Sequence, residues 1–324
     1  MKGEIFMQKI PKPLLKAMLR VSAYRMKRQE EKRFQAAVRE SDYPVQRDIC
    51  YEKGKSKGHL LDIYENGSGQ KRSPLIIYIH GGGLFCGDKI RGEAFCRTLA
   101  EKGNIVVSIN YRLIPEVTFP EQIGDILSAF RWIDQHQGRL GYDPQAVFVT
   151  GDWAGALLAV YAAAVNQNQM LADLLKLRGT RLKIQALGLI SGMFYFYQRN
   201  RIGRMYSLLF GNHYKEVPYL SYMKPHNLLE KCSIPPCYLV TSEEDMLKES
   251  TKAFSAELEK RGIPHQMHCW DRGEKGTLGK TFCVLHPEWK ESAQTIEEML
   301  EYFKLCQKRS EPTQIELEYS RSVI

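Results

Sequence analysis

Apolar and polar positions change their spacing along this chain, and a boundary near residue 74 separates two patterns. Residues 11–39 carry apolar side chains at roughly helical spacing, which predicts one or two helices. Residues 45–51 and 59–64 are predicted to be strands on either side of a glycine-containing turn, and together they predict an antiparallel hairpin. In the second of these strands, apolar and polar residues alternate.

Repeated strand–helix units follow from residue 74 onward. The strands are short continuous apolar runs, as is typical of strands buried on both faces. They are predicted at 74–79, 104–109, 146–150, 183–190, 236–241 and 265–270, and the helices at 91–102, 120–137, 155–166, 248–261 and 286–305. Such units imply an α/β fold, in which a largely parallel sheet carries helices on both faces.

The segment 192–231 breaks this rhythm and is rich in aromatic residues. An insertion between strands is a common way to build a lid over the carboxyl ends of a sheet, and the N-terminal helices could supply the rest. Ordinary packing explains the segment equally well. We therefore divide the chain into an N-terminal helical lid segment at 1–44, an α/β domain at 45–306 that contains the insertion, and a polar tail at 307–324.

The composition indicates a folded protein with a substantial core. Hydrophobic residues make up 44% of the 324 positions, which is enough for a substantial core. The longest apolar runs are too short to span a bilayer, and the N-terminal pattern is not that of a signal peptide. Eight scattered cysteines without a C-x-x-C pair favour reduced, mostly buried thiols. We therefore expect a cytoplasmic protein.

The net charge of +9 is unevenly placed, because lysines and arginines crowd the first forty residues. A basic helix of this kind can make weak contact with an acidic membrane surface. The interpretation we favour is a solvated outer face on a helix that packs by its other side. No nucleic-acid-binding motif accompanies the charge, so we expect no nucleic-acid partner.

The stretch Gly151-Asp152-Trp153-Ala154-Gly155 joins a predicted strand to a helix of small residues. Many hydrolases place a nucleophile on such a sharp turn, in the pattern Gly-x-Ser-x-Gly. Small residues flank the nucleophile because the strained backbone leaves no room for larger ones. In this chain the nucleophile position holds Trp153.

Three consecutive glycines, residues 81–83, come directly after the predicted strand 74–79 and His80. Glycines in such a position can expose backbone N–H groups and let a ligand approach closely. Behind an α/β strand, this is the oxyanion-hole motif of lipases and esterases. We expect His80 to hold the glycine loop by hydrogen bonding.

Further motifs occur at 110–116, 119–120, 151–155, 235–247 and 262–264. With the glycine motif, they make the chain resemble the hormone-sensitive-lipase-like branch of the α/β-hydrolase carboxylesterases and lipases. The motifs stand in the order that the family has, and they cover roughly residues 58 to 305. The resemblance implies an α/β-hydrolase fold with a mostly parallel eight-stranded sheet.

The resemblance also assigns roles to individual residues. It implies an oxyanion hole formed by the backbone N–H groups of Gly82, Gly83 and Ala154. It places the acid of a catalytic triad at Asp245, on the loop after the strand 236–241. The other role open to Asp245 is to cap the following helix.

Two members of the implied triad depart from the family pattern. The serine position holds Trp153, and the histidine position, two residues before Phe282, holds Lys280. Indole cannot add to a carbonyl carbon, and lysine at its ordinary pKa is protonated and cannot accept a proton. We therefore interpret the chain as a carboxylesterase-like scaffold that is inactive as an ester hydrolase. It would be a pseudoenzyme whose pocket binds a small acyl-type ligand or a partner.

Other interpretations stay open. Asp152 before Trp153 resembles the elbow of haloalkane dehalogenases and epoxide hydrolases, in which the aspartate attacks, although those enzymes also need a histidine. The chain could also be a substituted copy from an active lineage of ester hydrolases. Ser242 and Thr150 are nearby hydroxyls, but no feature places a base beside them. We find no metal-ligand cluster, phosphate-binding glycine loop or dinucleotide fingerprint, so we expect neither a metal nor a cofactor.

Overall fold

A mixed sheet forms the centre of the fold, in the strand order β1-β2-β4-β3-β5-β6-β7-β8. The computed structural model describes residues 12–37, 44–54, 56–65, 72–195, 206–279 and 281–310. Within them the strands are β1 (Val45–Cys50), β2 (Leu60–Tyr64), β3 (Ser73–Ile79), β4 (Ile105–Ile109), β5 (Tyr142–Asp152), β6 (Ile184–Ile190), β7 (Cys237–Ser242) and β8 (His265–Trp270). β2 pairs antiparallel with β1 and β4, and the remaining pairs are parallel. The predicted hairpin and the mostly parallel eight-stranded sheet are confirmed.

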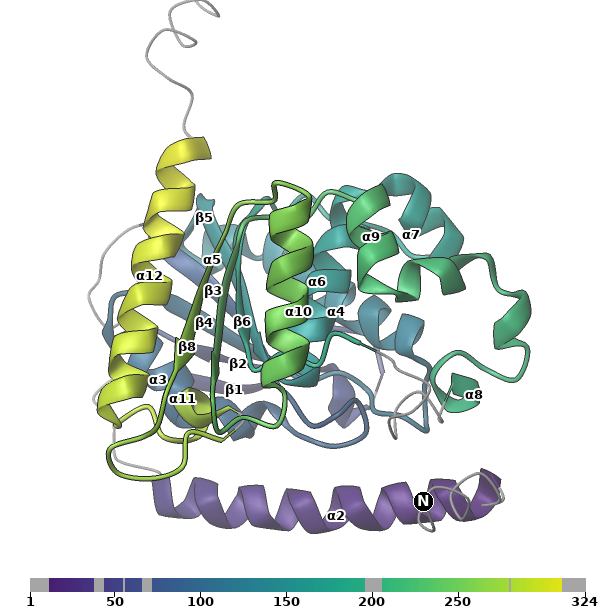
Figure 1. The fold of residues 1–324 in the computed structure, drawn as a ribbon, viewed down its shortest axis with the longest axis horizontal. Coiled ribbons are helices and arrows are strands. Elements are labelled where there is room, and N and C mark those ends of the chain that lie inside the picture. The colour runs from purple at the N-terminus through teal and green to yellow at the C-terminus, as the bar shows by residue number, and fades with distance from the viewer. Residues whose placement is uncertain are drawn as a thin grey trace, which may run out of the picture.

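Helices cover both faces of this sheet (Figure 1). Buried apolar side chains form one cluster on each side of it. One face carries α3 (Glu93–Glu101), α11 (Phe282–Leu285) and α12 (Lys290–Ser310). The other carries α4 (Phe119–Gln135), α6 (Ala154–Gln167), α7 (Gln169–Leu175) and α10 (Lys248–Lys260). A short helix, α5 (Gln137–Leu140), follows α4. All eight cysteines are free thiols, and six of them are buried.

The observed helices differ from the predicted ones in several places, among them the C-terminal region, where α11 was not predicted and α12 begins at Lys290 rather than at residue 286. The helix predicted at 91–102 begins as a 3₁₀ turn at Lys89–Gly92, where the Asp88 side chain accepts a hydrogen bond from the Ile90 N–H at 3.2 Å. α7 is not among the predicted helices, and its first turn is capped by Asn168. α12 continues to Ser310, past the predicted start of the polar tail. Residues 311–324 lie outside the described residues.

The polar side of β2 is buried, because α3 and the turn before it cover the sheet there. The Asp62 carboxylate lies 2.7 Å from the Lys89 ammonium and 3.4 Å from Arg47, which also pairs with Glu93 at 2.8 Å. Burial alone would raise the pKa of Glu93, but hydrogen bonds from Arg47 and Tyr64 outweigh it and hold that pKa below its usual range. For Asp62, burial dominates and raises the pKa. Alternation along β2 therefore marks a buried charge cluster, which ties the hairpin to α3.

The described part of the insertion 192–231 contains α8 (Tyr206–Leu209) and α9 (Pro225–Lys231), and residues 196–205 lie outside the described residues. The Phe210 ring packs edge-on against Phe119, with ring centroids 6.1 Å apart. The Tyr161 hydroxyl donates a hydrogen bond to the Tyr222 carbonyl at 3.0 Å. The insertion thus packs against α4 and α6, and its contribution to a lid stays a prediction.

A single helix, α2 (Lys12–Ala37), accounts for the predicted N-terminal helices. Figure 1 shows α2 lying across the edge of the molecule to which the parallel strands point. The Met26 sulfur lies 3.3 Å from the Cys86 sulfur, in the loop that follows β3. This is where a lid would lie, although the lid function of residues 1–44 stays a prediction. In the part of the chain that the structure describes, no helix is long and apolar enough to cross a membrane.

Candidate active site

Trp153 is the single residue between the end of β5 and the start of α6, and it forms a sharp turn. Its backbone has φ 52° and ψ −109°, a conformation that costs a non-glycine residue about 1–3 kcal/mol. Its N–H donates to the Ile190 carbonyl at 2.9 Å, and its own carbonyl accepts from the Met193 N–H at 3.0 Å. A Cβ built at Gly155 would overlap the Ile79 carbonyl at the end of β3. The turn therefore has the strained, glycine-dependent geometry of a nucleophile elbow, with an indole at its tip.

The glycine loop lies beside this turn. Gly82 and Gly83 have φ values of 129° and 66°, which glycine adopts without the strain that a side chain would add. The His80 Nδ1 lies 2.7 Å from the Gly81 carbonyl oxygen, and the Tyr111 hydroxyl donates to the His80 carbonyl at 2.8 Å. The predicted role of His80 in holding the loop is confirmed. Burial lowers the pKa of His80, so its imidazole stays neutral.

The Trp153 side chain extends towards the glycine loop. Its Cζ2 atom lies 3.5 Å from the place where a Cβ on Gly83 would stand. The indole is half-buried and packs against the core of the α4–α6 face. Ala154 is the first residue of α6, so its N–H has no acceptor within the helix. The structure thus brings Gly83, Ala154 and the indole together.

The Asp245 carboxylate is buried after β7. Its Oδ1 accepts a hydrogen bond from the Leu247 N–H at 2.8 Å, and its Oδ2 accepts from the Thr241 hydroxyl at 2.9 Å. Because α10 begins one residue after Leu247, these bonds shape the turn that leads into that helix. The role of Asp245 as a triad acid stays a prediction.

Lys280 lies outside the described residues, but its neighbours are well held. The Ser242 hydroxyl donates to the Leu278 carbonyl, and the Thr281 N–H donates to the Ser191 hydroxyl oxygen at 3.1 Å. The other nearby hydroxyl, that of Thr150, donates to the Gly188 carbonyl at 2.9 Å. Both hydroxyls that the sequence offers as substitutes, those of Ser242 and Thr150, therefore hold backbone carbonyls in place.

Asp152 lies behind the glycine loop and is fully buried. Its Oδ1 accepts from the Tyr78 hydroxyl and from the Gly81 N–H, each at 2.7 Å, and its Oδ2 lies 3.4 Å from the Arg91 Nε. Burial and the Asp152 charge raise the pKa of Tyr78 well above its usual range, so the phenol remains a donor. An attacking carboxylate needs access to substrate. The contacts of Asp152 tie it to Tyr78, the glycine loop and Arg91, and its role as a nucleophile stays a prediction.

Sequence reasoning missed Tyr78 and Arg91 as parts of this region. Arg91 also donates to the Thr281 hydroxyl at 3.1 Å, so it connects Asp152 to the loop that carries Lys280. A signal for Tyr78 existed, because a tyrosine inside a continuous apolar strand needs a partner for its buried hydroxyl. No comparable signal marks Arg91, whose contacts join segments distant in sequence.

The glycine loop supplies a direct test of this geometry. A Cβ on Gly82 would overlap the Cys86 carbonyl oxygen and would also be strained by the positive φ. We expect Gly82→Ala to lower the free energy of unfolding by about 3 kcal/mol. Gly103 is the matched control, because it also has a positive φ but has nothing within 4 Å of its Cβ position. Gly103→Ala should cost about 1 kcal/mol in the same urea titration, and equal losses would refute the overlap at Gly82.

The chain is similar to known proteins in sequence and in structure. A family model described as the alpha/beta hydrolase fold matches residues 76–276, which is more than half of the chain. The chain belongs to the α/β-hydrolase fold family. The match includes the glycine loop, the elbow and Asp245.

Among the relatives of this α/β-hydrolase chain, neutral cholesterol ester hydrolase 1 of Mus musculus is 41% identical over 138 residues, or 40% of this chain and 32% of that protein. Esterase LipI of Mycobacterium tuberculosis is 39% identical over 95 residues, or 29% of this chain and 30% of that protein. The match thus spans about a third of the length of these curated relatives. The crystal structure of esterase B from Lactobacillus rhamnosis superposes with a TM-score of 0.85 at 23% identity, covering 98% of this chain and 100% of that one. The similarity to esterase B supports the fold, and the scaffold is esterase- and lipase-like.

A metal site and the cavities of the protein were the other candidates among the described residues. Among them, no group of three or more His, Cys, Asp or Glu side chains is arranged to hold a metal ion. Three cavities lined by described residues lie away from the elbow, around Asp125, Thr180 and Arg131. The elbow and the glycine loop therefore remain the candidate site.

Proposed function

We propose that this chain is a pseudoenzyme of the α/β-hydrolase fold, which uses its carboxylesterase-like site to bind a small acyl-type ligand or a partner without hydrolysing it. The observation that carries the proposal is the Trp153 indole, which stands at the elbow and reaches to Gly83. A nucleophile at this point would attack a carbonyl held by the glycine loop. The Trp153 indole occupies the place of that nucleophile, and an indole cannot act as one.

The remaining parts of the site favour binding over chemistry. Backbone N–H groups at Gly82, Gly83 and Ala154 could still hold a carbonyl or carboxylate oxygen. The indole adds a flat apolar surface beside them, against which a short acyl chain can pack. Lysine at position 280 would be protonated at neutral pH and would attract a carboxylate rather than accept a proton.

The alternative chemistry, with Asp152 as a nucleophile towards haloalkanes or epoxides, has less support. Its carboxylate accepts hydrogen bonds from Tyr78 and the Gly81 N–H and pairs with Arg91, all behind the glycine loop. We propose that Asp152 positions that loop.

Ester hydrolysis by the purified chain is the test. We expect p-nitrophenyl acetate and butyrate to be turned over no faster than by the Asp245→Asn variant, since any residual rate would come from the oxyanion hole alone. An organophosphonate should leave the protein mass unchanged. Hydrolysis at ordinary esterase rates, together with a covalent phosphonate adduct, would overturn the proposal.

A further inference from the structure

The outer face of α2 exposes a row of large apolar side chains. Leu14, Met18, Val21 and Tyr24 are 52%, 48%, 52% and 60% exposed. Their spacing of four, three and three residues puts them along one side of the helix. The other exposed large apolar side chains among the described residues are Met170, Met246 and Leu305. An isolated exposed apolar side chain is ordinary, but a row of four on one helix face marks an interaction surface.

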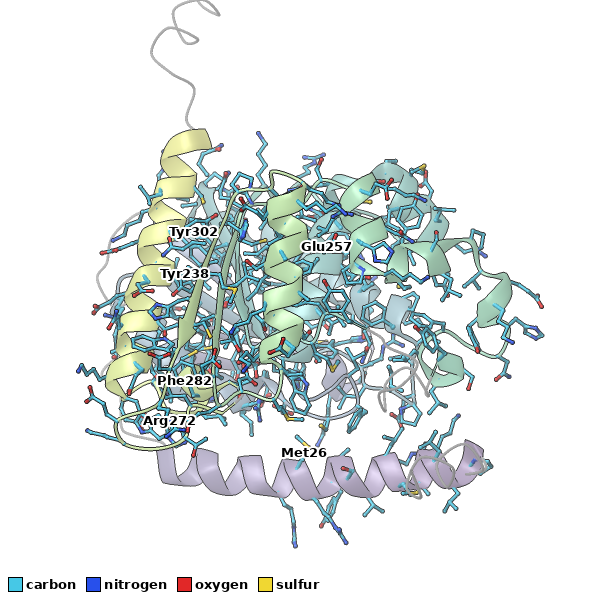
Figure 2. All side chains as sticks on the ribbon, in the orientation of Figure 1. Met26, Tyr238, Glu257, Arg272, Phe282 and Tyr302 are labelled. Atoms are coloured by element: carbon cyan, nitrogen blue, oxygen red, sulfur yellow. The ribbon has the colours of Figure 1, made fainter. Side chains whose placement is uncertain are left out.

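The opposite side of α2 packs against the rest of the protein. Leu19 is buried, Leu15 packs against the core, and the Met26 sulfur contacts that of Cys86 at 3.3 Å. Figure 2 labels Met26 between α2 and the rest of the molecule. The helix therefore has two apolar stripes, and the inner stripe is the one that attaches it to the fold.

The part of α2 that carries the outer row of Leu14, Met18, Val21 and Tyr24 is basic. Between residues 12 and 29 the sequence has six basic residues and no acidic one, and Arg20, Arg25 and Arg28 are exposed. The Arg28 guanidinium lies 5.5 Å from the centroid of the Tyr24 ring, so charge and apolar surface are adjacent. Arg20 pairs with Glu116 at 3.2 Å, which also holds α2 to the loop before α4.

We propose that the outer face of α2 docks on an anionic membrane surface. Its apolar row would enter the headgroup region while its basic residues contact lipid phosphates. A second copy of the chain fits less well, because a twofold contact would bring the same positive face against itself. Since α2 lies along the carboxyl ends of the strands, docking would turn the glycine-loop side of the protein towards the lipid (Figure 1). This inference goes beyond the pseudoenzyme proposal and stands whether or not the chain hydrolyses esters.

Sedimentation of the full chain with vesicles tests the inference. We expect binding to phosphatidylcholine vesicles that contain phosphatidylserine, weak binding to phosphatidylcholine alone, and release at high salt, because salt screens the charges. The triple variant Leu14→Ser, Met18→Ser, Val21→Ser should bind at least about tenfold more weakly. A triple variant at the other exposed sites, Met170→Ser, Met246→Ser, Leu305→Ser, should bind as the wild type does.

A second pair of variants separates α2 from another basic surface. Arg25→Glu with Arg28→Glu should abolish vesicle binding, whereas the exposed pair Arg178→Glu with Arg181→Glu should leave it unchanged. The opposite result, or absence of binding to anionic vesicles, would overturn the proposal. So would a wild-type dimer that the α2 triple variant dissociates in sedimentation velocity without any vesicle binding, since the occupant would then be a second copy.

Discussion

The double variant Trp153→Ser, Lys280→His is expected to hydrolyse p-nitrophenyl butyrate, whereas the unchanged chain is expected not to. The substitution restores a hydroxyl on an elbow that already has φ 52° and ψ −109°, beside a glycine loop with φ values that only glycine adopts readily. Loss of a cooperating triad costs about 10⁶-fold in kcat. Partial restoration should therefore raise kcat/KM at least about 10³-fold over the unchanged chain.

Further variants at positions 153, 280 and 245 serve as controls for this prediction. Trp153→Ser alone and Lys280→His alone should recover little, because a triad acts as a unit. Trp153→Ala with Lys280→His opens the same space without a nucleophile and should stay inactive. Adding Asp245→Asn to the active double variant should lower kcat by about 10⁴-fold if Asp245 is the acid.

The activity of the double variant tests whether the rest of the site is competent for ester hydrolysis. Recovered activity would mean that the scaffold, the oxyanion hole and Asp245 are competent, as expected for a copy from an active lineage that carries two substitutions. A folded double variant without activity would contradict the roles given to Gly82, Gly83, Ala154 and Asp245. Phosphonate labelling of the new serine, read by mass spectrometry, reports on the nucleophile independently of turnover.

The variant Asp152→Ala is expected to destabilise the fold by about 3–5 kcal/mol, because it leaves the buried Arg91 guanidinium without this carboxylate. It also removes the acceptor for the Tyr78 hydroxyl and the Gly81 N–H. Such a loss is a large part of the about 5–15 kcal/mol that stabilises a typical domain. Urea unfolding followed by far-UV circular dichroism measures it.

Tyr78→Phe and Asp152→Asn are the graded controls. Tyr78→Phe deletes one hydrogen bond and should cost about 1 kcal/mol, while Asp152→Asn keeps the shape and removes the charge. We expect the loss for Asp152→Asn to lie between the other two. If Asp152→Ala costs no more than Tyr78→Phe, Asp152 does not hold the loop as described. Haloalkane or epoxide turnover that disappears in Asp152→Asn would instead favour the nucleophile role.

Elements with strong local patterns could be predicted from the sequence. The parallel strands are continuous apolar runs, and the elbow lies at a strand–helix junction that small residues mark on both sides. α7 was missed because it has only seven residues, too few for a helical period to be distinctive, and because its start depends on a cap by Asn168. The alternation along β2 could not disclose that its polar side is buried, because the cations that pair with Asp62 come from β1 and from the turn before α3.

By itself, the sequence determined the order of the motifs: a glycine loop after one strand and Trp153 on the turn after another. Local order along the chain suffices for this, because each motif lies within a few residues. That Trp153 and Lys280 occupy the nucleophile and base positions stays a prediction. The tertiary structure decided what surrounds those positions. Contacts between residues 61 to 74 positions apart place Asp152 against Tyr78, Gly81 and Arg91, and packing across the loop sets the indole beside Gly83. Such contacts depend on how the strands are ordered in the sheet, which no local pattern encodes.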